Sequence, residues 1–554
     1  MPRQFALHHP PARLSLKANP FGKDVANLGL FRAIAQHGGL ERLHVAGHVH
    51  APAADVAADL ELTRPLAVSV GPIADLGQVA QAGALLRGQP TITEVAWRRE
   101  ALAGGARGFS LMGLVHTLAP PATREQIAQS SVAPVRPWDA LICTSPSVRE
   151  NLEAMFDGWE AHLLRRFGGV RAERPALPVI PLGVDAARFA ALADRPQVRS
   201  RLREELGVTE AEPMVLWVGR LSYFEKAFPQ AMFRAVRRAA ERAGVRAHFA
   251  LAGWFPEAGD EALYRQAAEL CAPGVRIHWI DGNDREAVGE LWAAADVFLS
   301  LVDNIQETFG ITPVEAKAAG LPVVASDWDG YRSTVRDGVD GFLVPTLGGA
   351  AGGLGEPLAV RHGAELDSYQ TYVGVVAQHT AVDVEAAADR LARLFADGDL
   401  RRRMGAAGRA AARETFDWPR IARRYMALAD ELAIVRAAAP AEPPAAPRPV
   451  RGDPFAAFAG FATRALDADT VLRLRDPLSP LAMGVTTHVR LDELYAPWRL
   501  SLDETAELLS RLQAAGGAAT AGELAAALAP QRRPWAMTTL AWLAKLGVLD
   551  AWGE

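Results

Sequence analysis

Two glutamates are the residues of this chain whose types and spacing most clearly suggest chemistry. Glu307 and Glu315 lie eight positions apart, with Phe309-Gly310 between them, and Glu315 falls in an Ala-rich run. Eight residues are a little over two helical turns, so a helix starting near Gly310 would carry Glu315 and leave Glu307 before its amino end. The N–H groups at that end attract anions, and carboxylates accept hydrogen bonds from hydroxyls. The stretch therefore suits a nucleotide-sugar, although spacing alone also allows an ordinary surface helix.

Two cations flank a second loop. Arg220 and Lys226 follow Gly219, which ends the apolar run 214–219. An Arg guanidinium offers a planar set of donors and a Lys ammonium offers a compact charge, so together they can neutralise a diphosphate. The alternative is a solvated surface pair. The position of both residues just after a predicted strand favours the diphosphate site.

Short apolar runs that alternate with helical stretches must position these residues. The alternation predicts two successive parallel, doubly wound α/β units. The expected strands are 111–115, 140–143 and 179–185 in the first unit, and 214–219, 247–253, 275–280, 297–302 and 323–326 in the second, with helices at 147–156 and 228–243. Ligands of such sheets lie at the carboxyl ends of the strands, so we expect a cleft between the two units.

The remaining segments differ in character. Residues 347–380 interrupt the second unit without a clear period, as functional or disordered loops do. Residues 413–435 are expected to be helical, with Asp417 as N-cap. The Ala-Pro stretch 437–449 predicts a stiff linker, and the tail from about residue 454 is expected to be helical, with capping boxes at 501–504 and 520–523. The tail has a weak winged-helix outline, but its second helix carries few cations, which favours protein docking or packing over DNA binding.

Composition excludes several classes of protein. A chain of 554 residues is too long to fold around a single hydrophobic core, so about three domains are expected. The net charge of −5 gives no overall electrostatic attraction to nucleic acid. Cys143 and Cys271 are expected to be buried thiols. No signal core or membrane span is evident, so we expect a cytoplasmic protein. Peripheral contact at the inner membrane face, through the basic amphipathic segment 160–174, is the alternative to a core-facing helix.

The motifs taken together resemble the donor-binding domain of glycosyltransferase family 4. They are Gly219-Arg220-Leu221 with Lys226, the Glu307 to Ala316 stretch, and Gly320-Leu321-Pro322-Val323, supported by 179–185 with Phe189, 337–344 and 416–418. The resemblance covers most of residues 1–435 and is strongest from 214 to 345. Members of this family are retaining, metal-independent enzymes with the GT-B fold, in which two Rossmann-like domains face a cleft.

The resemblance implies a domain organisation. We expect an acceptor-side domain at 1–195 and a donor domain at 196–412 with the insertion 347–380. A helix at 413–436 would pack back on the first domain, followed by an Ala/Pro linker at 437–453 and a helical accessory domain at 454–554 with a weak winged-helix outline. The sequence departs from the family pattern at two places: residues 300–306 differ from it, and the Gly-Gly doublet that many members carry near Gly22 is missing. The insertion and the tail lie outside it.

The resemblance also implies roles for individual residues. Arg220, Lys226 and Glu307 would be catalytic, the cations neutralising the diphosphate and Glu307 contacting the donor sugar. Donor binding would involve Gly219, the backbone of Phe309, Gly310 and Ile311, the ribose-binding Glu315, Arg276 and Ile277 near the base, and His116 and Gly22 from the first domain. No metal-ligand cluster is evident in the sequence, so we expect no metal and no other cofactor.

The expected function is transfer of a sugar from a nucleotide-diphosphate sugar to an acceptor hydroxyl in glycan or polysaccharide biosynthesis, a hexosyltransferase-type reaction. A glycan or lipid-linked acceptor is expected, with no nucleic acid and at most peripheral membrane contact, while the C-terminal domain would bind protein. Two alternatives remain open. One is a synthase that makes a soluble disaccharide or sugar phosphate conjugate, and the other is a non-catalytic, glycosyltransferase-like interaction module.

Overall fold

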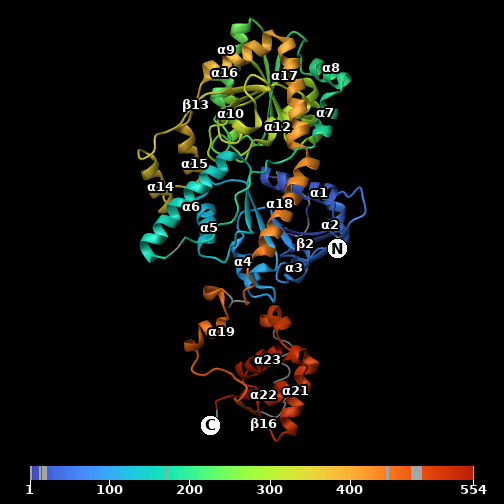
Figure 1. Cartoon of the computed structure of the whole chain (residues 1–554), viewed down its shortest axis with the longest axis vertical. Helices are drawn as coiled ribbons and strands as arrows, with labels where there is room; N and C mark the ends of the chain where they lie inside the picture. The colour runs from blue at the N-terminus through green and yellow to red at the C-terminus, as the bar shows by residue number, and fades with distance from the viewer. Residues whose placement is uncertain are drawn as a thin grey trace. The chain divides into compact units, whose positions relative to one another are not determined.

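The computed structural model describes residues 3–11, 14, 21–169, 171–443, 448–475 and 490–552. The chain divides into two compact units, Met1–Arg448 and Pro449–Glu554 (Figure 1). This division falls inside the predicted linker 437–453, of which residues 444–447 lie outside the described residues. Residues 19–20 of the loop before Gly22 also lie outside them.

The first lobe of the larger unit is built on a six-stranded sheet of order β3-β2-β1-β4-β5-β6, in which every pairing is parallel. Its strands are β1 (Gln4–His8), β2 (Arg42–Gly47), β3 (Ala67–Pro72), β4 (Ala84–Arg87), β5 (Ser110–Val115) and β6 (Ala140–Cys143). Its helices are α1 (Gly22–His37), α2 (Ala53–Asp59), α3 (Gly77–Ala82), α4 (Thr93–Glu100), α5 (Pro121–Ala128) and α6 (Pro146–Phe167). The strands predicted at 111–115 and 140–143 are therefore present.

The segment predicted as a strand at 179–185 is not one. It makes only isolated bridges, from Val179 to Cys143 and from Val184 to Asp417. Pro178 and Pro181 have no backbone N–H to donate, and this prevents a continuous ladder. The segment instead passes between the lobes as an extended connection.

The second lobe repeats the architecture with a parallel sheet of order β12-β11-β10-β7-β8-β9. Its strands are β7 (Met214–Val218), β8 (His248–Gly253), β9 (Arg276–Asp281), β10 (Val297–Ser300), β11 (Val323–Ser326) and β12 (Gly341–Val344). Its helices are α7 (Ala186–Ala193), α8 (Pro196–Glu205), α9 (Pro229–Ala243), α10 (Asp260–Cys271), α11 (Arg285–Ala294), α12 (Ile311–Ala319), α13 (Tyr331–Thr334), α16 (Val384–Ala396) and α17 (Gly398–Ala411). The predicted α/β class, with two doubly wound lobes in the GT-B arrangement, is confirmed.

The insertion 347–380 is not the structureless loop that the sequence suggested. It contains α14 (Gly355–Gly363) and α15 (Tyr369–Gln378), and the antiparallel pair β13 (Thr346–Leu347) and β14 (Ala381–Val382) closes its base. The Ser368 hydroxyl caps α15 by accepting the Thr371 N–H at 3.1 Å. Each helix is only nine or ten residues long, too short for a clear hydrophobic period to show in the sequence.

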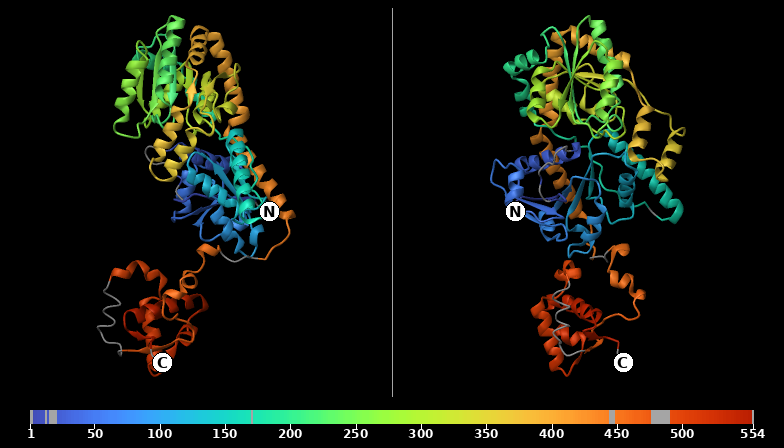
Figure 2. Two further views of the ribbon diagram at one scale, coloured as in Figure 1. Left: turned by 90° about the vertical axis from the view of Figure 1, so that its left-hand side faces the viewer. Right: turned by 180° about the vertical axis from the view of Figure 1, so that it is seen from behind.

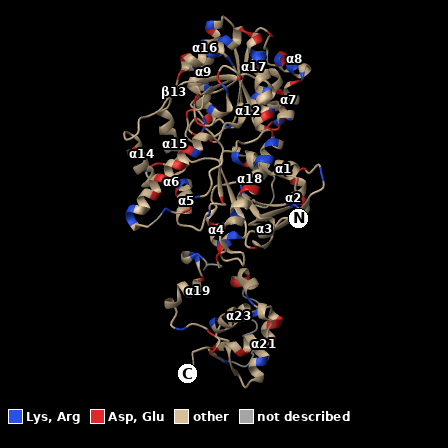
Figure 3. Ribbon diagram, in the orientation of Figure 1, with Lys and Arg blue, Asp and Glu red and all other residues tan. Residues whose placement is uncertain are grey.

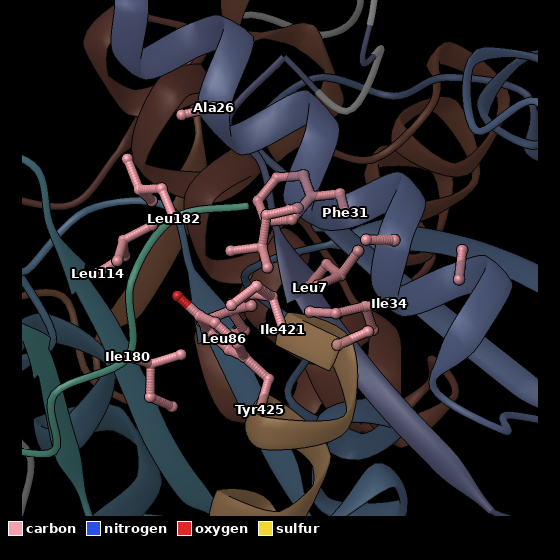
Figure 4. Close-up of a cluster of buried hydrophobic side chains, with 14 of the residues drawn as sticks. Leu7, Ala26, Phe31, Ile34, Leu86, Leu114, Ile180, Leu182, Ile421 and Tyr425 are labelled. Carbon is pink, nitrogen blue, oxygen red and sulfur yellow. The ribbon is translucent and has the colours of Figure 1, made fainter. Parts of the chain in front are cut away.

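The helix α18 (Trp418–Ala438) returns to the first lobe. Ile421 and Tyr425 join Phe31 and Ile34 of α1 in the cluster of buried side chains shown in Figure 4. Asp417 occupies the N-cap position of α18, as expected, but its carboxylate accepts the Ala186 N–H of α7 at 3.1 Å and bonds no N–H of α18. This carboxylate therefore links the starts of two helices.

The smaller unit, seen in two further views in Figure 2, combines helices with a small sheet. It contains α19 (Pro454–Ala457), β15 (Val471–Leu474), α21 (Leu502–Ala514), β16 (Ala518–Thr520), α22 (Ala521–Ala526), α23 (Arg533–Lys545) and β17 (Leu549–Asp550), with the antiparallel order β16-β15-β17. Both predicted capping boxes are present, at Ser501 with Glu504 and at Thr520 with Glu523. Leu472, Leu508 and Leu540 belong to its own core.

Charges of both signs are interspersed along the elements, in keeping with the small net charge (Figure 3). Within the described ranges, each helix is too short or too polar to cross a lipid bilayer.

Candidate functional site

A cavity of about 520 Å³ is lined by residues from both lobes of the larger unit. The first lobe contributes Gly22, Lys23 and His116, and the second contributes Gly219, Arg220, Lys226, Glu307, Phe309, Gly310 and Ile311. Gly219, Gly253 and Gly282 come at or just after the ends of β7, β8 and β9. The cavity therefore lies at the carboxyl ends of the strands, where doubly wound folds bind ligands.

Three glycines at these strand ends bring the backbone close to the cavity. A Cβ added to Gly253 would lie 2.0 Å from the Gly219 carbonyl oxygen, and one on Gly282 would lie 2.7 Å from the Gly253 Cα. No other residue type fits there without displacing the backbone. The cavity wall at this place is consequently main chain rather than side chain.

Lys226 and Glu307 form an ion pair in the cavity. The Lys226 Nζ donates to the Glu307 Oε2 at 3.0 Å, and the Gly310 N–H donates to the Glu307 Oε1 at 3.2 Å. Burial by itself would raise the pKa of Glu307, but the Lys226 charge and the N–H groups of Phe309 and Gly310 more than offset it, and the pKa is lowered. Glu307 is thus a carboxylate at neutral pH, held just before the amino end of α12.

Gly310 fixes the direction of α12. Its φ is +87°, in the left-handed region, and an added Cβ would lie 2.1 Å from the Tyr331 ring. Both the backbone angle and the ring require glycine. Ile311 and Thr312, in the first turn of α12, line the cavity, and first-turn N–H groups have no intrahelical acceptor. The amino end of α12 is therefore placed to meet an anion in the cavity.

Arg220 is held by contacts from both lobes. Its guanidinium forms an ion pair with Glu225 and lies 5.2 Å from the Phe21 ring centroid and 5.9 Å from that of Trp254. Phe21 belongs to the first lobe, and cation–π contacts hold a guanidinium without removing its charge. The cation is thereby fixed beside the cavity and shielded from water, with 13% of its side chain exposed.

His116 belongs to a set of contacts that join the lobes next to Glu307. Its Nε2 lies 2.9 Å from the Asn27 Oδ1, and its carbonyl oxygen accepts the Thr308 hydroxyl at 2.6 Å. Thr144 donates from the first lobe to the Thr308 carbonyl at 3.3 Å. Burial, with a contribution from Lys23, lowers the pKa of His116 to about 4, so its ring is neutral.

Glu315 is not among the cavity-lining residues. It lies on α12, three and four positions after Thr312 and Ile311, so the three residues share one helix face and Glu315 is one turn farther from the cavity. Burial, partly offset by Arg188, raises the pKa of Glu315 to about 7. Its contact with ribose stays a prediction.

Arg276 and Ile277, which were expected near the nucleotide base, do not line this cavity. They are the first two residues of β9, whereas Gly282 and Asn283, which follow its last residue Asp281, line the cavity. A six-residue strand advances about 3.3 Å per residue, which separates its ends by about 17 Å. Since ligands meet the carboxyl ends of parallel strands, any base-binding residue on β9 is to be sought at Gly282 and Asn283.

Several cavity residues were missed by the sequence reasoning. Trp254 and Asn283 come just after predicted strands, so the carboxyl-end rule could have identified them. Lys23 follows Gly22 and could have been named with it. Gln306 precedes Glu307 directly, but Tyr369 comes from the insertion, and no motif pointed to it.

In the part of the chain that the structure describes, no group of three or more His, Cys, Asp or Glu side chains is arranged to hold a metal ion. Metal independence stays a prediction.

Comparison with known proteins identifies a family model that matches most of the second lobe. Residues 198–347 match the family described as "Glycosyl transferases group 1", which confirms the predicted sugar-transferase domain. A D-inositol 3-phosphate glycosyltransferase of Nocardia farcinica is 34% identical over 177 residues, covering 31% of this chain and 37% of that protein. The enzyme of the same name from Geodermatophilus obscurus is 34% identical over 170 residues, covering 30% of this chain and 36% of that protein. The matches thus span well under half the length of these relatives.

Two solved structures are similar over most of the chain. HepE of Anabaena, in complex with UDP and glucose, is 17% identical, with a TM-score of 0.47 and coverage of 77% of this chain and 100% of that one. Sucrose-phosphate synthase from Thermosynechococcus elongatus is 19% identical, with a TM-score of 0.49 and coverage of 78% and 100%.

Proposed function

We propose that this protein is a retaining, metal-independent glycosyltransferase of family 4 that transfers a sugar from a nucleotide-diphosphate sugar to an acceptor hydroxyl. One observation carries the proposal. Arg220, Lys226, Glu307 and the amino end of α12 meet at a single cavity between the lobes, and their domain matches the group 1 glycosyltransferases. This set offers two cations and backbone donors to a diphosphate, with a carboxylate beside the sugar.

The chemistry follows from where charge develops. As the bond between the sugar and the diphosphate breaks, negative charge gathers on the leaving phosphate, and donors fixed in advance stabilise it. Arg220 and Lys226 supply the charges, and the first-turn N–H groups of α12 supply dipoles. In the retaining route proposed here the acceptor hydroxyl attacks from the face that the phosphate leaves, and the phosphate takes its proton. No protein nucleophile is needed.

The acceptor would meet the sugar from the first lobe, where His116 and Lys23 line the cavity. A glycan or lipid-linked acceptor is our first candidate, with the reaction in the cytoplasm and peripheral membrane contact where the acceptor is lipid-linked. A second candidate is a synthase that glycosylates a small soluble sugar phosphate. The name of the matching relatives, D-inositol 3-phosphate glycosyltransferases, favours it. A screen of acceptors with the identified donor separates the two, since only the second candidate yields a soluble low-mass product.

The smaller unit would bind a protein partner.

A thermal-shift panel of nucleoside diphosphates and nucleotide-sugars tests the proposal. A ligand at a hundred times its dissociation constant stabilises the native state by about 2.7 kcal/mol, which raises the melting temperature measurably. We expect one base to give the largest shift and Arg220→Gln to reduce that shift. Absence of any shift across the panel in the wild-type protein would contradict the proposal.

A further inference from the structure

The insertion contributes a side chain to the cavity. Tyr369 is the first residue of α15 and lines the cavity, and its hydroxyl donates to the Gln306 Oε1 at 2.6 Å. In Figures 1 and 2, α14 and α15 extend from the second lobe on the side of the unit where α6 lies. The hydrogen bond therefore joins the insertion to the residue immediately before Glu307.

The same helix also covers the loop that carries Lys226. A Cβ added to Gly374 of α15 would lie 3.3 Å from the Phe224 Cβ, so the helix backbone packs closely on this loop. Val373 and Ala377 of α15 are almost completely buried. The helix is thus packed in place and is not a loose flap over the cavity.

A polar contact links the two loops beneath α15. The Asn304 side-chain amide donates to the Phe224 carbonyl, and the Asn304 Oδ1 accepts the Gln306 N–H at 2.8 Å. Gln306 is consequently held from two directions, through its backbone by Asn304 and through its side chain by Tyr369. Because Glu307 is the next residue, its position relative to Lys226 depends on how firmly Gln306 is held.

The Tyr369 hydroxyl keeps its proton at ordinary pH. Burial is the main cause of a raised pKa at Tyr369, with the nearby Glu225 carboxylate adding to it and Arg220 opposing it. The phenol therefore serves as a hydrogen-bond donor to Gln306 throughout the range in which an assay would run.

We propose that α15 is a built-in wall of the donor cavity and that Tyr369 is a positioning residue, holding Gln306 so that Glu307 keeps its orientation toward Lys226 and the reacting sugar. This inference rests on the proposed function. It assigns a role in sugar transfer to the insertion, which lies outside the family pattern. Since nucleotide binding relies on other groups, loss of the hydroxyl should slow transfer and leave nucleotide affinity unchanged.

The variant Tyr369→Phe removes only the hydroxyl. Loss of one hydrogen bond of ordinary net strength predicts that kcat falls about twofold to twelvefold. The melting shift given by the best nucleoside diphosphate should stay at the wild-type value. Gln306→Ala should lower kcat similarly, and the double variant should be no slower than the slower single variant, because both changes break one contact. Tyr372→Phe is the matched control because Tyr372 lies on the same helix and does not line the cavity. Its ring stacks on that of His362, with 4.9 Å between the ring centroids.

The outcomes are distinguishable. A wild-type protein that binds no nucleoside diphosphate would overturn the proposed function itself. A wild-type protein that binds and transfers, with Tyr369→Phe as fast as Tyr372→Phe, would overturn the role of Tyr369 alone. Additive losses in the double variant would also overturn it, since they would show that Tyr369 and Gln306 act separately. A reduced kcat with unchanged nucleotide binding and a non-additive double variant supports the inference.

Discussion

Replacing Lys226 by methionine keeps most of the side chain's length and removes its charge. In the native cavity the Lys226 Nζ lies 3.0 Å from the Glu307 Oε2, and 33% of the Lys226 side chain is exposed against 14% of Glu307. The change thus removes one cation from the diphosphate site and leaves a mostly buried carboxylate without its ion-pair partner. Each of these two effects can be tested by its own measurement.

The first effect concerns turnover. Two unit charges about 4 Å apart interact by about 4 kcal/mol at an effective dielectric constant near 20. Only the part of this interaction energy that develops as the bond between the sugar and the diphosphate breaks affects kcat. Because Lys226 is partly exposed, solvent and salt weaken the interaction further. We therefore expect a loss of about 2–3 kcal/mol in transition-state stabilisation, which is a fall in kcat of about thirtyfold to 150-fold.

The second effect concerns stability. The native pKa of Glu307 is lowered, so its pair stabilises the fold at neutral pH, and this contribution is lost as pH falls through the native pKa. In Lys226→Met, burial acts without the offsetting cation, so the Glu307 pKa should rise above its ordinary value. We expect unfolding at pH 7 to become easier by about 1–3 kcal/mol. Adding Glu307→Gln should recover much of that stability without restoring activity.

Steady-state kinetics with a saturating nucleotide-sugar donor measure the first effect, and thermal unfolding between pH 5 and pH 8 measures the second. Lys226→Arg is the matched control because it keeps the charge and should retain more activity than Lys226→Met. A folded Lys226→Met protein whose kcat stays within about threefold of wild type would refute the assignment of Lys226 to the leaving diphosphate.

Three further predictions concern other residues. Burial raises the pKa of Asp303 to about 8, so between about pH 4 and pH 8 the native state retains a proton that the unfolded chain has lost. The free energy of unfolding should therefore fall as pH rises through this range. Thermal melts of Asp303→Asn should show a flatter pH dependence over the same range. If Glu315 binds ribose as a carboxylate, its pKa of about 7 predicts that nucleotide affinity, measured by calorimetry, rises from pH 6 to pH 8, and a Glu315→Gln protein with the same pH dependence would contradict this. A Cβ on Gly29 of α1 would lie 2.5 Å from the Trp418 ring, so the ring packs tightly on the first lobe, and Trp418→Ala should destabilise the larger unit by about 3 kcal/mol in denaturant unfolding. A loss below about 0.5 kcal/mol would show that this contact does not anchor α18.

The sequence was informative wherever local rules determine the structure. The strands at 140–143 and 323–326 were predicted with their observed bounds because each is a short apolar run between turn residues. The turn at Gly310 was predicted because it directly precedes a helical run that ends at a glycine. Such signals lie within a few residues of one another, so no knowledge of the tertiary structure is needed.

Other features depend on contacts between distant segments. Residues 179–185 have a strand-like composition, yet Pro178 just before them and Pro181 among them prevent a continuous ladder. Arg276 was placed at the cavity by analogy, although strand direction alone assigns it to the opposite edge. The bond between Tyr369 and Gln306 joins residues 63 positions apart, across an insertion that carries no motif, and only the folded chain reveals it.

The central claim is that Arg220, Lys226 and the amino end of α12 together bind the diphosphate of a nucleotide donor. A crystal structure of the protein with the nucleoside diphosphate that gives the largest thermal shift tests this most directly. Phosphate oxygens within hydrogen-bond distance of Arg220, Lys226 and the first-turn N–H groups of α12 are the result we predict. A diphosphate bound elsewhere, with these donors still engaged only by protein carboxylates or water, would contradict the claim.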